Sequence, residues 1–210
     1  MANVSSPYGL KPINLIGGQP FAGQFREYKV AATNPAAIYA GDLIVLSAAG
    51  LPASVSTSPT AGTTAGIVGV CVGVRYVVPG TKQPMYAQYL PLGAVAAGYT
   101  DVYVRVVDDP DALFQIQGSA ALGTFNSGTG GSGWPGAIGK NIALGGFGGS
   151  TTSGNSSMTV VVGTNGGSLG TGTLAMRIVD IVEGTEGDLY PEFVVKYNQA
   201  VHSYYFATGV

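Results

Sequence analysis

The segment Ile67-Val-Gly-Val-Cys-Val-Gly-Val-Arg-Tyr-Val-Val78 carries the strongest structural signal in this chain of 210 residues. β-Branched and aromatic residues fill it, and these favour strands because their side chains pack well on a pleated surface. Its glycines, Gly69 and Gly73, indicate a β-bulge or a place where a neighbouring strand packs closely. The segment therefore predicts a long strand with an irregularity near its middle.

Segments of the same kind lie on both sides of it. Val102–Val107 alternates along its length, as a half-buried strand does, and Leu174–Val182 also separates its apolar side chains onto one face. We expect further strands at Phe25–Ala31, Leu43–Leu46, Met85–Leu90, Leu113–Gln117, Met158–Val162, Glu192–Tyr197 and the aromatic Val201–Phe206.

No stretch of the chain shows a clean helical period, and Gly and Pro interrupt every candidate helix. Nine or ten strands without helices predict an all-β fold, either a β-sandwich or a β-barrel of jelly-roll-like type. We expect an extended N-terminal arm over residues 1–23, followed by a single all-β domain over residues 24–210.

The arm contains Pro and Gly too often for a helix or a regular strand. Apolar side chains are nevertheless interleaved along it, and an arm exposed to water would not need them. We therefore expect the arm to lie extended on an apolar surface. 

A glycine-rich insertion spans Gly118–Gly172, with 18 glycines and one charged side chain, Lys140. Glycine at this density excludes a long helix and weakens any strand. The insertion is also too poor in charge for an ordinary solvated linker. We predict a long loop that lies against another surface or is held by neighbouring chains.

Charged residues make up only 10% of the chain, against roughly 25% in typical globular proteins, and the net charge is −2. A surface so poor in charge is often covered in an assembly. The scattered Lys and Arg residues argue against nucleic-acid binding, which needs basic patches. The apolar runs are too short for a membrane helix, and no signal peptide is evident, so we expect a soluble protein made in the cytoplasm.

The sequence contains only weak matches to cofactor-binding and catalytic motifs. Gly128–Gly133 and Gly131–Gly136 match G-x-G-x-x-G, but no helix follows to bind a dinucleotide, so we expect no cofactor. Gly166–Gly170 matches G-x-S-x-G and would pair Ser168 with His202 in a hydrolase, yet it also lacks the helix that a nucleophile elbow needs. We expect no enzyme activity and interpret His202 as a structural histidine.

Other polar and sulfur side chains have plain structural interpretations. The acidic segments Asp108–Asp111 and Glu183–Asp188 match no calcium loop, and acids beside Gly and Pro are typical of turns. We favour turns and expect no metal. Cys71 has no partner for a disulfide, and we expect it to be a buried thiol.

The chain has 12 tyrosines, most of them in or beside predicted strands. Tyrosine suits protein interfaces because it offers apolar area together with a hydroxyl that tolerates water. Ordinary strand propensity explains the same pattern equally well. As candidates for an interface between copies of the chain we take Tyr86, Tyr89, Tyr103, Tyr204 and Tyr205.

Several short motifs carry a resemblance to a group of tailed-phage virion proteins. They are Ser6-Pro-Tyr-Gly-Leu-Lys-Pro12, the segment Gly17–Gln24 with the Tyr28-Lys-Val strand, Gly41-Asp-Leu-Ile-Val45 and Ile67–Gly73. Members of this group are regarded as capsid decoration (cement) proteins or as virion structural proteins of unassigned position. The resemblance covers about residues 1–77 and none of the glycine-rich insertion or the C-terminal third.

The resemblance implies a cement protein on the exterior of the phage capsid that clamps neighbouring major capsid subunits, with self-association into a trimer. We expect the arm to contact the capsid through Pro7, Tyr8, Leu10, Pro12, Ile13, Leu15, Ile16 and Phe21. The alternative is a fibre, adhesin or carbohydrate-binding module of the virion, in which Trp134 stacks on a sugar ring. Neither interpretation involves nucleic acid or a membrane.

Overall fold

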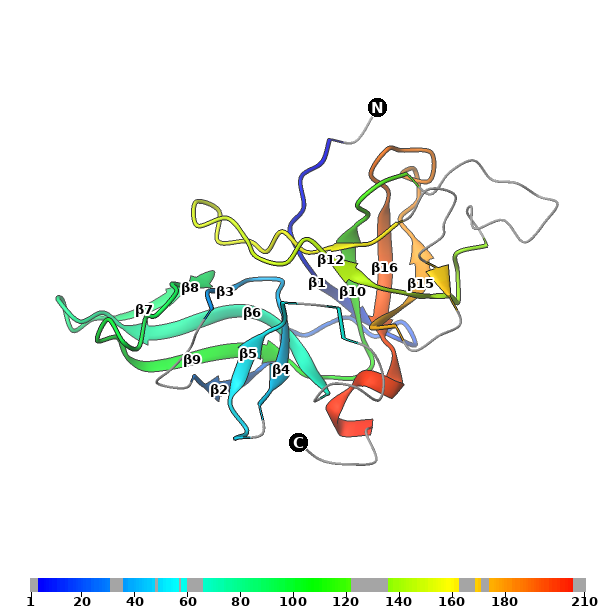
Figure 1. Ribbon diagram of the computed structural model, residues 1–210. Helices are drawn as coiled ribbons and strands as arrows, with labels where there is room; N and C mark the ends of the chain where they lie inside the picture. Colours follow the sequence, from blue (N-terminus) through cyan, green and yellow to red (C-terminus); the bar gives the residue numbers. More distant parts are fainter. Residues whose placement is uncertain are drawn as a thin grey trace.

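The computed structural model describes residues 4–30, 36–47, 49–56, 58–59, 66–121, 136–162, 169–170 and 174–205. Within these ranges the chain forms β-strands and short 3₁₀ turns, so the predicted all-β fold is confirmed (Figure 1). Among the described residues, no helix has the length and apolar character needed to cross a lipid bilayer.

Two six-stranded antiparallel sheets dominate the molecule (Figure 1). The first sheet has the order β1 (Lys11–Leu15), β10 (Ala112–Gln117), β16 (Glu192–Tyr197), β15 (Met176–Ile181), β11 (Asn141–Ile142) and β14 (Leu169–Gly170). The second has the order β2 (Arg26–Lys29), β9 (Thr100–Val107), β6 (Ile67–Val77), β4 (Leu43–Leu46) and β5 (Pro52–Ser54), with β7 (Pro84–Ala87) also paired to β6. Two small sheets complete the fold, β3 (Ile38–Tyr39) with β8 (Tyr89–Leu90) and β12 (Leu144–Gly145) with β13 (Thr159–Val160).

The predicted central strand is β6, which pairs with β4, β7 and β9. Its ladder with β9 shifts register between Cys71 and Gly73. A Cβ atom at Gly69 would lie 2.2 Å from the carbonyl oxygen of Val107, closer than any real contact. Both glycines therefore have the roles that the sequence predicts, a register irregularity and a close strand approach.

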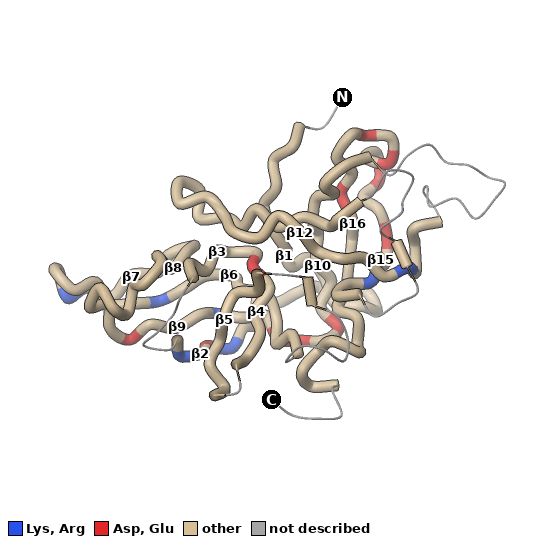
Figure 2. The backbone as a smooth tube through the Cα atoms, in the orientation of Figure 1, with Lys and Arg blue, Asp and Glu red and all other residues tan. Residues whose placement is uncertain are grey.

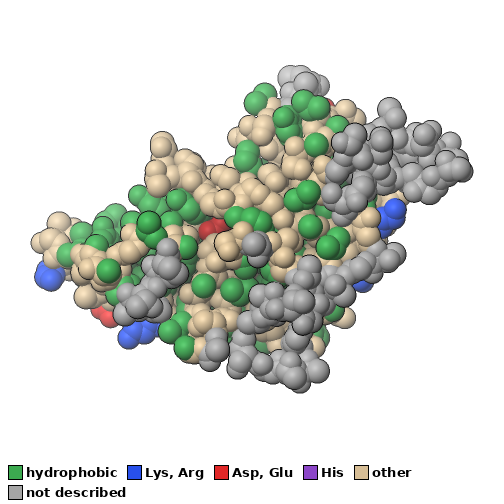
Figure 3. Space-filling model, viewed as in Figure 1, with side chains coloured by type: hydrophobic (Ala, Val, Ile, Leu, Met, Phe, Trp, Pro, Cys, Tyr) green, Lys and Arg blue, Asp and Glu red, His purple; other side chains and the backbone are tan. Residues whose placement is uncertain are grey.

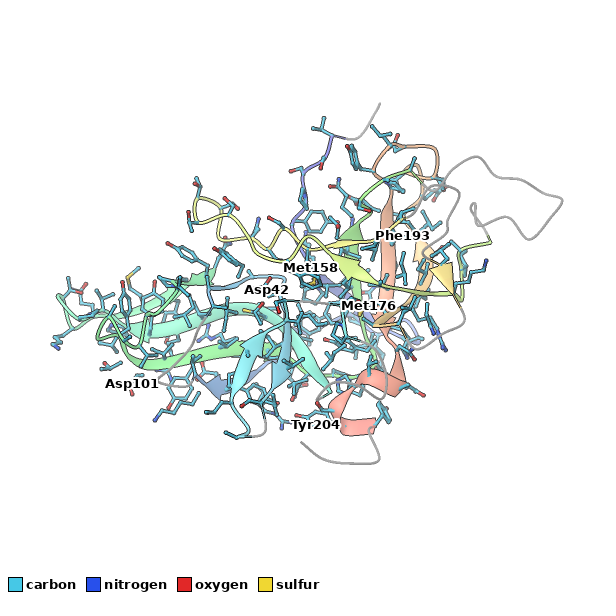
Figure 4. The ribbon with its side chains drawn as sticks, in the orientation of Figure 1. Asp42, Asp101, Met158, Met176, Phe193 and Tyr204 are labelled. Carbon is cyan, nitrogen blue, oxygen red and sulfur yellow. The ribbon has the colours of Figure 1, made fainter. Side chains whose placement is uncertain are left out.

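The hydrophobic core has two parts. The larger cluster takes residues from both sheets, including Phe114 and Phe193 from the first and Ile67 from the second, and it also contains Met158 and Met176 (Figure 4). The smaller cluster joins one face of the second sheet to the β3–β8 pair, and it includes Ile38, Leu90, Val74 and Val104. On the opposite face of the second sheet, Leu43, Val70 and Val107 pack in the larger cluster, whereas Tyr103 and Arg105 of β9 lie outside both clusters.

The N-terminal arm differs from the prediction. Residues 11–15 form β1, which pairs with β10, and the side chain of Leu10 is 1% exposed in the larger core. The prediction that proline and glycine prevent a regular strand is therefore wrong here. Pro12 is tolerated because β1 lies at the edge of its sheet, where a missing backbone donor costs little, and the ladder is irregular between Pro12 and Asn14.

The glycine-rich insertion is also more ordered than a long loop over its described part. Residues 136–162 contain β11, β12 and β13, and they bury Ile142, Leu144 and Met158. The glycines do allow close approach to another surface, which is the chain's own: a Cβ at Gly149 would lie 2.4 Å from the ring of Tyr39. The prediction of a long loop is wrong for these residues, whereas their packing against a surface is confirmed.

The predicted strand at Val201–Phe206 is wrong over its described residues. The chain there forms two 3₁₀ turns, η2 (Gln199–Val201) and η3 (Ser203–Tyr205). Aromatic residues have high strand propensity, but here their rings pack around the buried His202, whose ring centroid lies 4.9 Å from that of Tyr197. Tertiary packing outweighs the local preference.

Candidate interaction surface

The outward face of the second sheet gathers arginine and aromatic side chains across its strands. Residues directly opposite in an antiparallel ladder share a face. Glu27 lies opposite Arg105, and Tyr103 lies opposite both Lys29 and Arg75. Arg75 in turn lies opposite Tyr86 of β7. Four strands thus contribute to one surface.

Contacts on this surface hold the two arginines in place. Glu27 accepts a hydrogen bond from Arg75 Nη2 at 3.2 Å and another from Arg105 Nε at 3.1 Å. The guanidinium carbon of Arg105 lies 4.8 Å from the centroid of the Phe25 ring and 4.5 Å from that of Tyr86. The guanidinium carbon of Arg75 lies 4.5 Å from the Tyr103 centroid. We name Phe25, Glu27, Arg75, Tyr86, Tyr103 and Arg105 the arginine–aromatic face.

The electrostatics of the face depend on Glu27. Partial burial alone would raise the pKa of this carboxyl, but the hydrogen bonds from Arg75 and Arg105 outweigh that effect and lower the pKa. Glu27 is therefore ionised at neutral pH and orients both guanidinium groups. Tyr86 remains 64% exposed and Phe25 43%. Partly exposed ion pairs stabilise a fold only weakly, so these pairs contribute little to the stability of the fold.

Gly73 of β6 also belongs to this side of the sheet. It lies opposite Arg105 in the β6–β9 ladder and so shares the outward face. A Cβ atom at this position would lie 3.3 Å from the carbonyl oxygen of Ala87 in β7. The sequence predicts a bulge at this glycine, and the β6–β9 ladder does shift register between Cys71 and Gly73.

A second polar cluster joins the C-terminal turns to the second sheet. Asp108 Oδ2 accepts hydrogen bonds from the hydroxyl groups of Tyr28 at 3.1 Å and Tyr204 at 3.0 Å, and it lies 2.9 Å from Arg26 Nε. Asp109 Oδ1 accepts the backbone N–H of Asp111 at 2.9 Å, as in an Asx turn. The acidic segment 108–111 is thus a turn whose carboxylates bind donors of the same chain. No group of three or more His, Cys, Asp and Glu side chains suited to a metal occurs in the described part of the chain.

The five tyrosines proposed for an interface lie in three places. Tyr86 and Tyr103 both belong to the arginine–aromatic face. Tyr89 stacks on Tyr39 at 5.8 Å between ring centroids. Tyr204 and Tyr205 flank His202 and are about half exposed. Sequence reasoning missed the partners Phe25, Glu27, Arg75 and Arg105, although each arginine follows a buried valine in a predicted strand.

The eight arm residues proposed for capsid contact are mostly covered by the chain itself. Leu10 is buried, and Leu15 and Phe21 pack against the larger core. Ile16 is exposed at 44%, whereas the remaining four are half-buried, namely Pro7, Tyr8, Pro12 and Ile13. Contact of Leu10 with a capsid is therefore corrected to a core role, because its side chain is enclosed in the folded chain.

The motifs behind the phage resemblance meet at one junction. Leu10 N–H donates to Gly41 O at 3.0 Å, and Gly41 N–H donates to Cys71 O at 2.7 Å. A Cβ at Gly9 would lie 2.8 Å from Gly41 O, so the two motif glycines allow the segments to touch. The adjacent Asp42 is buried and accepts the N–H of Tyr39 at 2.9 Å (Figure 4). These motifs therefore hold the fold together at this point.

His202 and Cys71, two residues with side chains capable of chemistry, both lie in buried surroundings. His202 is 0% exposed, and burial lowers its pKa to about 4, with Asp108 opposing the shift in part. Its interpretation as a structural histidine fits this position. Burial raises the pKa of the Cys71 thiol to about 12, which keeps it protonated and inert. Trp134 and Ser168 lie outside the described residues.

Comparison with known proteins adds no relative. No protein-family model, no curated protein and no solved structure matches this chain.

Proposed function

We propose that this chain is a decoration (cement) protein of a tailed-phage capsid, which binds the outside of the assembled head and clamps neighbouring major capsid subunits. The observation that carries this proposal is the arginine–aromatic face, an exposed surface on a chain with only 10% charged residues. Aromatic residues and arginine are enriched where proteins bind each other. The resemblance over residues 1–77 supplies the virion as the setting.

The surface as a whole supports an assembly role. Hydrophobic side chains are spread over the view in Figure 3, and few charged side chains lie among them. Exposed large apolar residues include Val4 at 78%, Leu92 at 67% and Ile16 at 44%. Such surface is costly to leave in water, and an assembled shell would cover part of it.

Cement function requires no chemical step. A protein that binds only the assembled shell stabilises that shell by mass action, and many copies on one head add their contributions. The arm remains the segment proposed to touch the capsid, through the side chains that it leaves exposed. In the described arm these include Val4 and Ile16.

The test is co-sedimentation with heads assembled from the major capsid protein of the same phage. Deletion of the whole arm is unsuitable because it would remove Leu10 and β1 from the fold. We therefore compare a Val4→Ser, Ile16→Ser double variant with Leu92→Ser, whose side chain is similarly exposed but lies in the turn-rich segment 91–98.

We expect the unmodified chain and Leu92→Ser to sediment with the heads, and the arm variant to bind about tenfold more weakly. Equal binding by all three would remove the arm from the capsid contact. Absence of binding by the unmodified chain would overturn the cement function itself.

A further inference from the structure

Charge is unevenly distributed over the molecule. The acidic loop, which we define as residues 183–189 between β15 and β16, contains Glu183, Glu186 and Asp188 and no Lys or Arg. Figure 2 shows these acids at the free end of the first sheet, at the upper right, and the cations of β2, β6 and β9 in the left-hand part of the molecule. The two regions are therefore held apart within one chain.

The arginine–aromatic face carries the opposite charge. Arg75 and Arg105 share a single carboxylate, Glu27, and Lys29 stands opposite Tyr103 on the same side of the sheet. Glu27 receives one hydrogen bond from each arginine. Since a guanidinium has about five N–H donors, each arginine keeps most of its donors for a further acceptor.

The acidic loop is a preformed structure. Thr185 N–H donates to Val182 O at 3.1 Å, and Asp188 N–H donates to Thr185 O at 3.0 Å. The Thr185 hydroxyl accepts the N–H of Glu192 at 3.1 Å. Leu189, which follows Asp188 in the loop, is 56% exposed. The acidic loop, with the apolar Leu189, is therefore complementary to the arginine–aromatic face, with its exposed rings and arginines.

We propose that the acidic loop of one copy docks on the arginine–aromatic face of the next copy. This inference rests on the proposed cement function and deepens it by specifying how copies of the chain join. Glu183 and Asp188 of one copy accept hydrogen bonds from Arg75 and Arg105 of the other, and Leu189 packs on the exposed rings of Phe25 and Tyr86. Charge-assisted hydrogen bonds around an apolar centre are typical of specific protein interfaces.

The geometry of such a contact sets the symmetry of the assembly. The loop and the face lie far apart on the molecule (Figure 2), so we expect a contact that repeats head to tail rather than one exchanged reciprocally about a two-fold axis. A head-to-tail contact gives a closed ring when the rotation between copies closes, and a trimer at a three-fold position of a capsid is the smallest such ring.

Charge reversal tests the contact with the full-length chain, by light scattering in low salt. One variant carries Arg75→Glu and Arg105→Glu on the face, and the other carries Glu183→Lys and Asp188→Lys on the loop. All four positions are at least partly exposed, so the fold should tolerate the changes, and thermal melting checks this. The matched control is Lys11→Glu with Lys140→Glu, which reverses two cations outside the face.

We expect the unmodified chain and the control to form trimers, and each charge-reversed variant alone to be monomeric. A chain that carries all four reversals should form trimers again, because its acidic face then meets the basic loop of the next copy. A monomeric unmodified chain, charge-reversed variants that still form trimers, or a monomeric chain with all four reversals would each overturn the contact. Failure of this contact leaves the cement function standing if the chain still sediments with heads, so the two outcomes are distinguishable.

Discussion

His202 makes stability depend on pH. Burial lowers the pKa of its imidazole to about 4, whereas in the unfolded chain the pKa is about 6.5. Between these values the unfolded state binds a proton that the folded state does not, so stability falls as the pH decreases from about 6.5 to about 4. The full effect is about 3 kcal/mol.

The variant His202→Phe keeps an aromatic ring in this cluster and removes the proton site. Between pH 7.5 and pH 5.0, we expect the unmodified chain to lose about 2 kcal/mol more of its unfolding free energy than the variant loses. Urea unfolding monitored by fluorescence at both pH values measures the difference. Parallel pH dependence in the two proteins would show that His202 is protonated equally in both states.

No side chain fits at the position of Gly69. A Cβ there would lie 2.2 Å from Val107 O and 2.5 Å from Val106 Cγ1, so Gly69→Ala forces β6 and β9 apart. We expect a loss of about 3 kcal/mol in unfolding free energy, the range of severe overpacking.

The matched control is Gly80→Ala, at which a Cβ would meet no atom within 4 Å. This change should alter the unfolding free energy by less than about 0.5 kcal/mol in either direction. Denaturant unfolding compares the two variants. Equal stability of both would mean that the strands separate at Gly69 without cost.

Among the elements, β1 shows how a strand forms where local sequence opposes it. Its place is set by a ladder to β10 and by Leu10, which is enclosed in the larger core. Leu10→Ala should therefore reduce the unfolding free energy by about 3 kcal/mol, through lost burial and a cavity. Ile16→Ala, one residue past β1 and 44% exposed, should change it by less than about 1 kcal/mol.

Chemical denaturation of both variants tests whether the arm belongs to the folded domain. Equal and small effects would mean that Leu10 leaves the core readily and that the arm is free to bind elsewhere.

Strands with strong alternation could be predicted from sequence to within a few residues. Glu192–Tyr197 agrees with β16, in which every second residue is buried, and Leu43–Leu46 agrees with β4 as a short apolar run. The expected strand Met158–Val162 contains β13, whereas β1 and the strands β11 and β12 of the glycine-rich insertion could not be predicted. Their formation depends on partners distant in sequence, such as β10 for β1.

The candidate surface was predictable only in part, for the same reason. Tyr86 and Tyr103 are interface candidates from composition alone, but their arginine partners depend on register. Arg75 meets Tyr103 because β6 and β9 pair in one register, and Glu27 meets Arg105 because β2 adds to the same sheet. A shift of one residue would turn these side chains to the other face, and no local pattern fixes that choice.

At the scale of the whole molecule, the proposed ring and the proposed capsid contact reinforce each other. A trimer presents three arms to the shell at once, so after the first arm binds, the others bind as intramolecular events. The apparent affinity for heads then exceeds that of one arm by about 100-fold without any new capsid contact.

The variant with Arg75→Glu and Arg105→Glu tests this coupling because both arginines lie on the second sheet, outside the arm. Alone, it should bind heads about 100-fold more weakly than the unmodified chain. With Glu183→Lys and Asp188→Lys added in the same chain, it should regain binding as the trimer reforms. Co-sedimentation over a concentration series measures both affinities. If the monomeric variant binds heads as tightly as the unmodified chain, each arm acts independently, and ring formation contributes nothing to cementing the shell.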